Sequence, residues 1–371
     1  MKGRRSGTKA PVALITGGAG FIGTNVAAKL AESGRRVRIF DNLSRRGVEQ
    51  NLLWLKDTYG DAVEIALGDV RDRTSIDRHL RGVSEVYHFA AQVAVTSSLG
   101  DPLYDFAVNA GGTLNLLEAL RAIETPPPLV FTSTNKVYGD LEDVDLVPDS
   151  SRYVPADTHT RMSGINEERA VNFHSPYGCS KGAADQYVLD YARTFGMPAV
   201  VFRMSCIYGP HQFGTEDQGW VAHFLIRAME GRPITIYGDG LQVRDVLYVD
   251  DLVRAFQLAQ ENIDALAGQA FNMGGGPART TSLVELVELI SKLERAEVQL
   301  DFDHWREADQ RYYVSNTTRF EQATGWKPKV SVAEGVKSLH AWLKADRETP
   351  TGARGGPRPT TSLPVASQTV A

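Results

Sequence analysis

The stretch of residues 11–23, PVALITGGAGFIG, constrains the fold of this chain more than any other segment. A short apolar run ends there in Gly17, Gly20 and Gly23, each three positions after the last. After a buried strand, such glycines allow a tight turn, let the backbone approach a pyrophosphate, and let the following helix pack closely with its positive dipole end toward the anion. The pattern indicates a dinucleotide site. An ordinary strand-to-helix turn would give the same glycines, and the spacing differs by one residue from the usual Gly-x-Gly-x-x-Gly.

Strand-like apolar runs and helical segments alternate after this turn. The runs lie at residues 36–40, 63–67, 85–91, 129–134 and 199–202. This order predicts βαβ units and a parallel sheet. We expect one helix over about residues 102–121. Residues 139–173 are polar and show little periodicity, so we expect a functional loop or lid there.

Asp41 ends the second predicted strand, about 20 residues after the glycines. At that place a carboxylate accepts hydrogen bonds from the adenosine ribose and repels a 2′-phosphate, which favours NAD over NADP. Arg45 and Arg46 follow closely and would instead attract that phosphate. The residues therefore favour NAD and leave NADP open.

Composition narrows the class of protein. A chain of 371 residues with 42% hydrophobic content predicts one large or two closely joined domains. A net charge of −5 with scattered basic residues gives no attraction to nucleic acid or to an anionic membrane, and we expect neither partner. No apolar run is long enough for a membrane span. We expect disorder in the leader, residues 1–10, and in the Pro/Thr/Ser/Gly-rich tail, residues 345–371.

Cysteine and histidine usage predicts no metal site. Cys179 and Cys206 are too few for a disulfide framework or a zinc site, and the eight histidines show no close pairing at metal-ligand spacing. The cytosol is therefore the expected compartment.

Tyr177 and Lys181 are the strongest candidates for chemistry. They stand four residues apart at the start of a predicted helix and so share one face. The Lys181 ammonium, together with a cationic nicotinamide, would lower the pKa of the Tyr177 phenol. The ionised phenol would then take a proton from a sugar hydroxyl. Such a pair alone is commonly coincidental, but here it follows a dinucleotide unit and a strand that ends in Thr134. We expect the Thr134 hydroxyl to hydrogen-bond the same substrate oxygen.

These motifs together resemble the extended short-chain dehydrogenase/reductase family, in its branch of NAD-dependent sugar-nucleotide epimerases and dehydratases. The resemblance covers about residues 12–343 and is carried by residues 16–23, 41–42, 68–70 and 89–91, Asn109, Thr134 and Tyr177/Lys181. It implies an α/β fold, a Rossmann-type doubly wound parallel sheet with a smaller C-terminal α/β substrate domain. The NAD domain would comprise residues 11–202 with a returning segment of about 243–274, and the substrate domain residues 203–242 and 275–344.

The resemblance also implies a set of NAD-binding residues. Asp69 and Val70 would lie at the adenine, Ala90 and Gln92 along the cofactor, and Lys181 on the nicotinamide ribose. The full expected set is Gly17, Gly20, Phe21, Ile22, Gly23, Asp41, Asn42, Asp69, Val70, Ala90, Gln92, Asn109 and Lys181.

The two residues after Thr134 bear on the reaction. Dehydratases of this family carry an Asp–Glu pair there, whereas this chain has Asn135 and Lys136. Without those carboxylates elimination lacks its acid and base, so epimerisation fits better. Residues 134–140, 173–187, 217–221 and 242–246 are similar to family members that invert C2 of a CDP-linked deoxyhexose with tightly held NAD. The alternatives are a UDP-sugar 4-epimerase, an oxidoreductase with free NAD turnover, and a sensor that binds NAD without turnover.

The resemblance places further residues at the substrate. Arg244, Arg306 and Asp309 would hold the diphosphate and nucleotide ribose, although each also fits a surface ion pair. Cys206 stands where many relatives have an Asn that touches the sugar, and it also fits a small packing residue. Asn135 and Lys136 complete the expected substrate-binding set.

A homodimer or homotetramer is expected from the family, in which the helix with the Tyr–Lys pair commonly packs against its copy. Small and aromatic side chains on that helix suit such a face, although a buried intramolecular face would look the same. These residues are Ala183, Ala184, Tyr187, Val188 and Tyr191.

Overall fold

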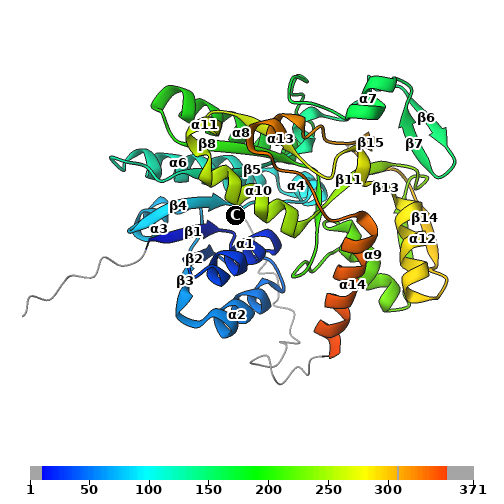
Figure 1. Ribbon diagram of the computed structural model, residues 1–371, viewed down its shortest axis with the longest axis horizontal. Helices are drawn as coiled ribbons and strands as arrows, with labels where there is room; N and C mark the ends of the chain where they lie inside the picture. The colour runs from blue at the N-terminus through cyan, green and yellow to red at the C-terminus, as the bar shows by residue number, and fades with distance from the viewer. Residues whose placement is uncertain (1–10, 307–308, 349–371) are drawn as a thin grey trace, which may run out of the picture.

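The computed structural model describes residues 11–306 and 309–348, and a seven-stranded parallel sheet lies at its centre (Figure 1). The strands run in the order β12-β8-β5-β4-β1-β2-β3, and every neighbouring pair is parallel. This is the doubly wound order, with its reversal between β1 and β4. The Rossmann-type prediction is confirmed. The strands are β1 (Val12–Thr16), β2 (Arg36–Asp41), β3 (Val63–Leu67), β4 (Val83–His88), β5 (Leu129–Thr134), β8 (Ala199–Met204) and β12 (Ala270–Met273).

Helices cover both faces of this sheet, so its central strands are buried on both sides. In β1, Ala13 and Ile15 pack against one group of helices and Leu14 against the other, because successive strand residues point to opposite faces. The first group is α1 (Phe21–Glu32), α2 (Val48–Tyr59) and α10 (Val249–Glu261). The second is α3 (Arg73–His79), α6 (Gly112–Arg121) and α8 (Ser175–Phe195).

The segment expected as one helix over residues 102–121 is interrupted. It forms α5 (Pro102–Phe106), a π-helical turn η2 (Ala107–Gly111) and then α6. Asn109 lies on the π-helical turn. Single π-helical turns inside longer helices occur frequently at functional sites.

A second, smaller α/β part lies beyond the carboxyl ends of the parallel strands. Its central strand β11 pairs in parallel with β9 and β15 and antiparallel with β13, and β10 pairs with β14. The strands are β9 (Cys206–Tyr208), β10 (Ile234–Tyr237), β11 (Val243–Tyr248), β13 (Thr280–Ser282), β14 (Leu300–Asp303) and β15 (Tyr312–Tyr313). A separate core joins β9, β10, β11 and β14 to α9 (Trp220–Met229), α12 (Leu283–Glu294) and α14 (Val332–Glu348).

The polar stretch expected as a loop at residues 139–173 contains regular structure. The antiparallel hairpin β6 (Leu146–Asp149) and β7 (Arg152–Pro155) is followed by α7 (Thr158–Ser163). The hairpin lies against the smaller part, where the Arg152 guanidinium pairs with Glu285 of α12 (Figure 1). Its strands are short and half-exposed, so they show no apolar run in the sequence.

The sheet topology can be compared with the segments predicted for the two domains. Of the expected returning segment 243–274, α10 and β12 lie on the large sheet, whereas β11 belongs to the small one. Phe320 of α13 (Thr318–Thr324) packs into the core of the large sheet. The division into two domains stays a prediction. The remaining helices are α4 (Val95–Gly100) and α11 (Ile263–Leu266).

The C-terminal helix extends past the predicted boundary of order. α14 continues to Glu348, four residues into the tail expected to be disordered from residue 345. The order there has a local cause, because Arg347 donates to the Ile226 carbonyl and pairs with Glu230 at 3.1 Å. The rest of the predicted tail and the predicted leader lie outside the described residues. Among residues 11–306 and 309–348, no helix is long and apolar enough to cross a membrane.

Candidate active site

The glycine turn after β1 is closed so tightly that two of its positions require glycine. Gly17 has a φ of +67° and its N–H donates to the Phe40 carbonyl at 2.8 Å. A Cβ on Gly17 would lie 2.6 Å from the Ala90 nitrogen, and one on Gly23 would lie 2.5 Å from the Gly17 oxygen. Gly20 is the N-cap of α1 and brings no side chain there. The turn therefore presents bare backbone and the positive end of α1, as an anion site requires.

Asp41 lies at the carboxyl end of β2, beside this turn. Its carboxylate accepts hydrogen bonds from the backbone N–H of Ala19 at 3.0 Å and of Leu43 at 2.8 Å. Burial raises the Asp41 pKa, and these N–H donors oppose that rise. Burial lowers the pKa of Arg45, and the Asp41 carboxylate opposes that change. The acid is thus fixed by the backbone with an arginine close by.

Asn42 and Asp69 are joined at the ends of β2 and β3. The Asn42 amide donates to the Asp69 carboxylate at 2.9 Å, and Arg71 pairs with the same carboxylate at 2.7 Å. Hydrogen bonds from Arg71, assisted by Asn42, outweigh partial burial and lower the Asp69 pKa to about 2. Asp69 therefore stays ionised over the usual pH range.

Asn109, predicted to bind the cofactor, makes its side-chain contacts inside the protein. Its amide oxygen accepts the Gln92 N–H at 2.9 Å, and its amide nitrogen donates to Ser180 Oγ at 3.0 Å and to Asp105 at 3.2 Å. Asn109 is 1% exposed. It therefore ties the loop after β4 to α8, and its contact with a cofactor stays a prediction.

Tyr177 lies near the start of α8, opposite the end of β5. Its N–H donates to Ser98 Oγ at 3.1 Å, and its hydroxyl is hydrogen-bonded to Thr134. Burial raises the Tyr177 pKa to about 12, and the hydrogen bond to Thr134 opposes the rise. The lowering of this pKa that the sequence suggests is therefore not produced by the residues of the chain alone.

Lys181 lies one turn further along α8. Its ammonium donates to the Thr132 carbonyl at 2.6 Å and lies 4.5 Å from the centre of the Phe131 ring. Burial lowers the Lys181 pKa to about 8, and Asp185 and Asp105 oppose this change. The Lys181 ammonium therefore lies against the carboxyl-terminal half of β5.

One cleft joins the glycine turn to the Tyr–Lys pair and continues to Trp220 at the start of α9. The predicted site residues that line it are Gly17, Gly20, Phe21, Ile22, Gly23, Asp41, Asn42, Val70, Ala90, Thr134, Asn135, Tyr177, Lys181 and Cys206. Within residues 11–306 and 309–348, the other predicted residues lie behind or beyond this lining. They are Asp69, Gln92, Asn109, Lys136, Arg244, Arg306 and Asp309.

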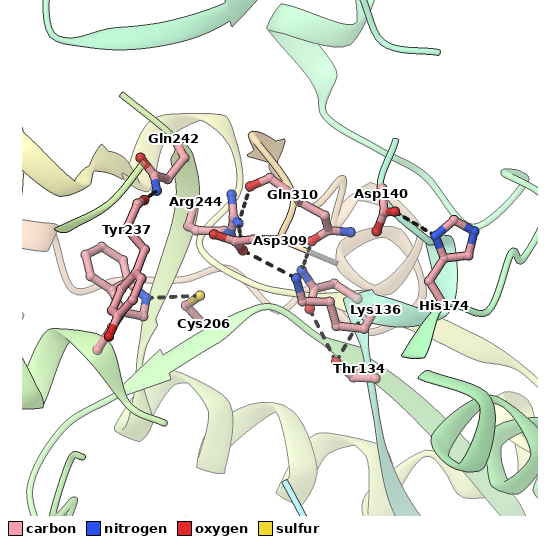
Figure 2. Close-up of polar contacts among 12 residues, drawn as sticks. Thr134, Lys136, Asp140, His174, Cys206, Tyr237, Gln242, Arg244, Asp309 and Gln310 are labelled. Carbon is pink, nitrogen blue, oxygen red and sulfur yellow. Dashed lines mark hydrogen bonds and ion pairs between the residues drawn. The ribbon is translucent and has the colours of Figure 1, made fainter. Parts of the chain in front are cut away.

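Cys206 lies in the wall of the cleft. Its sulfur accepts a hydrogen bond from the Trp220 indole N–H at 3.3 Å (Figure 2). Burial raises the pKa of the Cys206 thiol, although Arg244 and this hydrogen bond oppose the rise. The neutral thiol suits a lining residue and not a nucleophile.

The residues after Thr134 meet the residues around Asp309. The Asn135 amide donates to the Gln310 side chain at 2.9 Å, and the Lys136 ammonium lies 3.6 Å from the Asp309 carboxylate (Figure 2). Arg244 of β11 donates to the same Asp309 oxygen at 2.8 Å. Arg244 and Lys136 outweigh the effect of burial and lower the Asp309 pKa.

The Arg306 side chain points away from this group, although the Asp309 N–H donates to the Arg306 carbonyl at 3.4 Å. Its guanidinium carbon is 3.9 Å from the centre of the Tyr237 ring, and its NH1 donates to the Glu216 carbonyl at 3.0 Å. Asp217 lies 3.9 Å away and also bonds to Thr96 of α4 at 2.9 Å. The structure therefore brings Arg244 and Asp309 together, whereas the Arg306 guanidinium contacts Glu216 and Asp217 of another loop.

Comparison with known proteins identifies the family. Residues 14–339 match the family described as GDP-mannose 4,6 dehydratase. The chain belongs to this family of NAD-dependent epimerases and dehydratases. It is 43% identical over 339 residues to the CDP-paratose 2-epimerase of Salmonella typhi, covering 90% of this chain and 99% of that protein.

Solved structures of family members agree in fold. A UDP-glucose 4-epimerase from Thermotoga maritima with UDP-glucose is 31% identical, with a TM-score of 0.76 over 91% of this chain and 100% of that one. A UDP-glucose 4-epimerase of Thermus thermophilus in complex with NAD is 30% identical, with a TM-score of 0.74 over 90% of this chain and 99% of that one. The predicted NAD-dependent family membership is confirmed.

Several residues at this site were missed by sequence reasoning. Ser98 holds the backbone of Tyr177, Ser180 holds Asn109, and Gln310 receives Asn135. Each contact joins segments that lie at least 71 positions apart, so no local spacing signals it. Trp220, whose indole N–H donates to Cys206, lies within residues 217–221, where the sequence pattern predicts no role for it. In the part of the chain that the structure describes, no group of three His, Cys, Asp or Glu side chains could hold a metal ion.

Proposed function

We propose that this protein is an NAD-dependent nucleotide-sugar epimerase that inverts C2 of a CDP-linked hexose. The observation that carries the proposal is the 43% identity to CDP-paratose 2-epimerase over 99% of that protein. Thr134, Tyr177 and Lys181 lie together in the cleft that begins at the glycine turn, which supports an oxidation and reduction at one carbon. We also propose a cytosolic location, as expected from the two cysteines.

The residues of the cleft fit NAD. The bare backbone from Gly17 to Gly23 suits the pyrophosphate, and Asp41 stands where it would accept the adenosine ribose hydroxyls. Lys181 stands where it would meet the nicotinamide ribose. NAD, when bound, supplies a hydride acceptor that later returns the hydride.

The proton is handled by the chain itself. We assign Tyr177 Oη as the base that takes the proton of the sugar hydroxyl. The Thr134 hydroxyl would hydrogen-bond the same sugar oxygen. The positive charges of Lys181 and of a bound oxidised nicotinamide would favour the phenolate, against the burial that raises the Tyr177 pKa. Inversion then requires that the keto-sugar present its other face before hydride returns.

Dehydration lacks its acid and base at this site. Asn135 has a neutral amide bound to Gln310, and Lys136 carries an ammonium beside Asp309. Neither replaces the Asp–Glu pair that water loss would use. Epimerisation needs no such pair, because the proton and the hydride both return to the sugar.

A UDP-sugar 4-epimerase is the second candidate, favoured by the likeness to two solved UDP-glucose 4-epimerases. Incubation with CDP-, UDP-, GDP- and dTDP-hexoses, followed by NMR of the anomeric and C2 protons, separates the two. We expect a C2 epimer from a CDP-hexose. Interconversion of UDP-glucose and UDP-galactose with CDP-hexoses untouched would instead identify a 4-epimerase. Sustained NADH release would identify an oxidoreductase, and no turnover of any sugar would leave only NAD binding.

A further inference from the structure

The turn that follows the catalytic strand is anchored at both ends. Thr134 ends β5, and the backbone N–H of Lys136 donates to its Oγ1 at 3.3 Å. The Lys136 side chain leaves in the other direction and reaches Asp309, 3.6 Å away (Figure 2). One residue thus contacts both the catalytic threonine and the segment expected to hold the nucleotide.

The charges around Asp309 explain why this contact matters. Burial and Arg244 lower the Lys136 pKa, and the Asp309 carboxylate is the main group that opposes them. Asp309 is shared by two cations, since Arg244 donates to the same oxygen at 2.8 Å. Removal of Lys136 would leave the partly buried Asp309 with a single cation, and the Asp309–Arg244 pair would lose part of its alignment.

The neighbouring residues reinforce the same connection. The Asn135 amide donates to Gln310 Oε1, and Gln310 Nε2 donates to the Gly139 carbonyl at 2.6 Å. The Arg244 guanidinium also donates to the Gln310 carbonyl. Residues 309–310 are therefore held from the β5 side and from β11 at once.

We propose that Lys136 is a positioning residue for the nucleotide end of the substrate. It acts through Asp309 and Arg244 and sets their place relative to Thr134. The inference rests on the proposed function, in which Asp309 and Arg244 hold the nucleotide ribose and diphosphate. The competing role is direct contact between Lys136 and the reacting sugar.

CDP separates these two roles because it has the nucleotide end, with its ribose and diphosphate, and lacks the hexose that reacts. Calorimetry would measure its Kd with the NAD-loaded wild type and with Lys136→Met, Asp309→Asn and the double variant. We expect Lys136→Met to weaken CDP binding about tenfold, and the double variant to bind no more weakly than Asp309→Asn. With the sugar nucleotide, KM should rise about tenfold while kcat changes less than about threefold. Lys136→Arg should recover most of the affinity.

Two results would overturn the proposal. An unchanged CDP Kd in Lys136→Met with a large fall in kcat would mean that Lys136 acts on the sugar. Fully additive losses in the double variant would mean that Lys136 and Asp309 act independently. Lys292→Met, an exposed site on α12, is the matched control for loss of one lysine charge. If Lys136→Met is poorly folded, Asp309→Asn removes the same ion pair from the other side.

The proposed function can fail separately. UDP, GDP and dTDP are titrated alongside CDP, and the test uses the one that the wild type binds most tightly. A wild type that binds a nucleoside diphosphate but epimerises no sugar would refute the proposed function and leave the Lys136 result readable, because calorimetry needs no turnover. A wild type that binds none of the four would refute both.

Discussion

Tyr177 and Lys181 are both driven toward their neutral forms by burial. The Tyr177 pKa is raised to about 12 and the Lys181 pKa is lowered to about 8. A phenol with such a pKa is almost entirely protonated at neutral pH and cannot accept a proton, so further positive charge beside it is needed to populate the phenolate that acts as the base. The chain itself therefore places both residues in one cleft, and the pair requires a cationic neighbour for its chemistry.

The lowered Lys181 pKa predicts a pH dependence of stability. Between about pH 8 and the ordinary lysine pKa of 10.5, the unfolded chain holds this proton and the folded NAD-free protein does not. The free energy of unfolding therefore rises with pH across this window, by roughly 3 kcal/mol from this group. Lys181→Met removes that contribution. Urea unfolding of the NAD-free wild type and variant at both ends of the window measures the difference, and parallel pH profiles would contradict it.

At the scale of elements, we predict that the turn between β1 and α1 controls the retention of NAD. A Cβ on Gly23 would meet the backbone of Gly17 and Gly18 at 2.5 Å, so Gly23→Ala should force the turn and α1 apart. We expect the purified variant to retain less than about a tenth of the NAD held by the wild type. Chromatography of the nucleotide released on denaturation measures this.

Gly100→Ala is the control for that substitution. A Cβ at Gly100, at the end of α4, would have nothing within 4 Å, so this variant should retain NAD. Full retention by Gly23→Ala would show that the turn is not the cofactor site.

The elements that could be predicted are those whose signals are local. The buried strands of the large sheet appear as apolar runs, and the glycine turn follows from spacing alone. The hairpin β6–β7 could not be predicted, because its strands are short and half-exposed and are held by distant partners, such as the Leu241 carbonyl that accepts the Tyr153 N–H at 2.8 Å. The π-helical turn at Asn109 likewise has no sequence signature.

The residues of the site likewise divide into those that local sequence signals predict and those that only the fold brings together. Tyr177, Lys181 and Thr134 were found because helix spacing and strand ends place them. The link from Asn135 to Gln310 joins residues 175 positions apart, and only the folded chain reveals it. The resemblance named Asp309 and Arg244, but it did not reveal that Lys136 shares the Asp309 carboxylate with Arg244.

For the whole molecule, the face predicted for self-association needs correction. Ala184, Val188 and Tyr191 of α8 are buried in the core of the large sheet and are not available to a partner. They point inward because α8 packs them against β5, β8 and α6. Tyr187, on the same helix, is exposed.

We predict a homodimer through the exposed apolar side chains of α5 and α8. Leu103 and Phe106 of α5 are 82% and 59% exposed, and Tyr187 of α8, the helix that contacts α5, is 44% exposed. Exposed apolar groups of this kind commonly mark a contact surface. Light scattering should give at least the dimer mass for the wild type and the monomer mass for Leu103→Asp/Phe106→Asp at micromolar concentration. A monomeric wild type would refute the prediction.

For the whole enzyme, the proposed mechanism depends on the fate of the hydrogen at C2 of the sugar. CDP-paratose incubated with the protein in D₂O and followed by NMR tests it most directly. Inversion by removal and return of the same hydride predicts the C2 epimer with ordinary hydrogen retained at C2. Tyr177→Phe should slow this conversion by about 10² to 10⁴. Deuterium at C2, or no inversion at that carbon, would contradict the account.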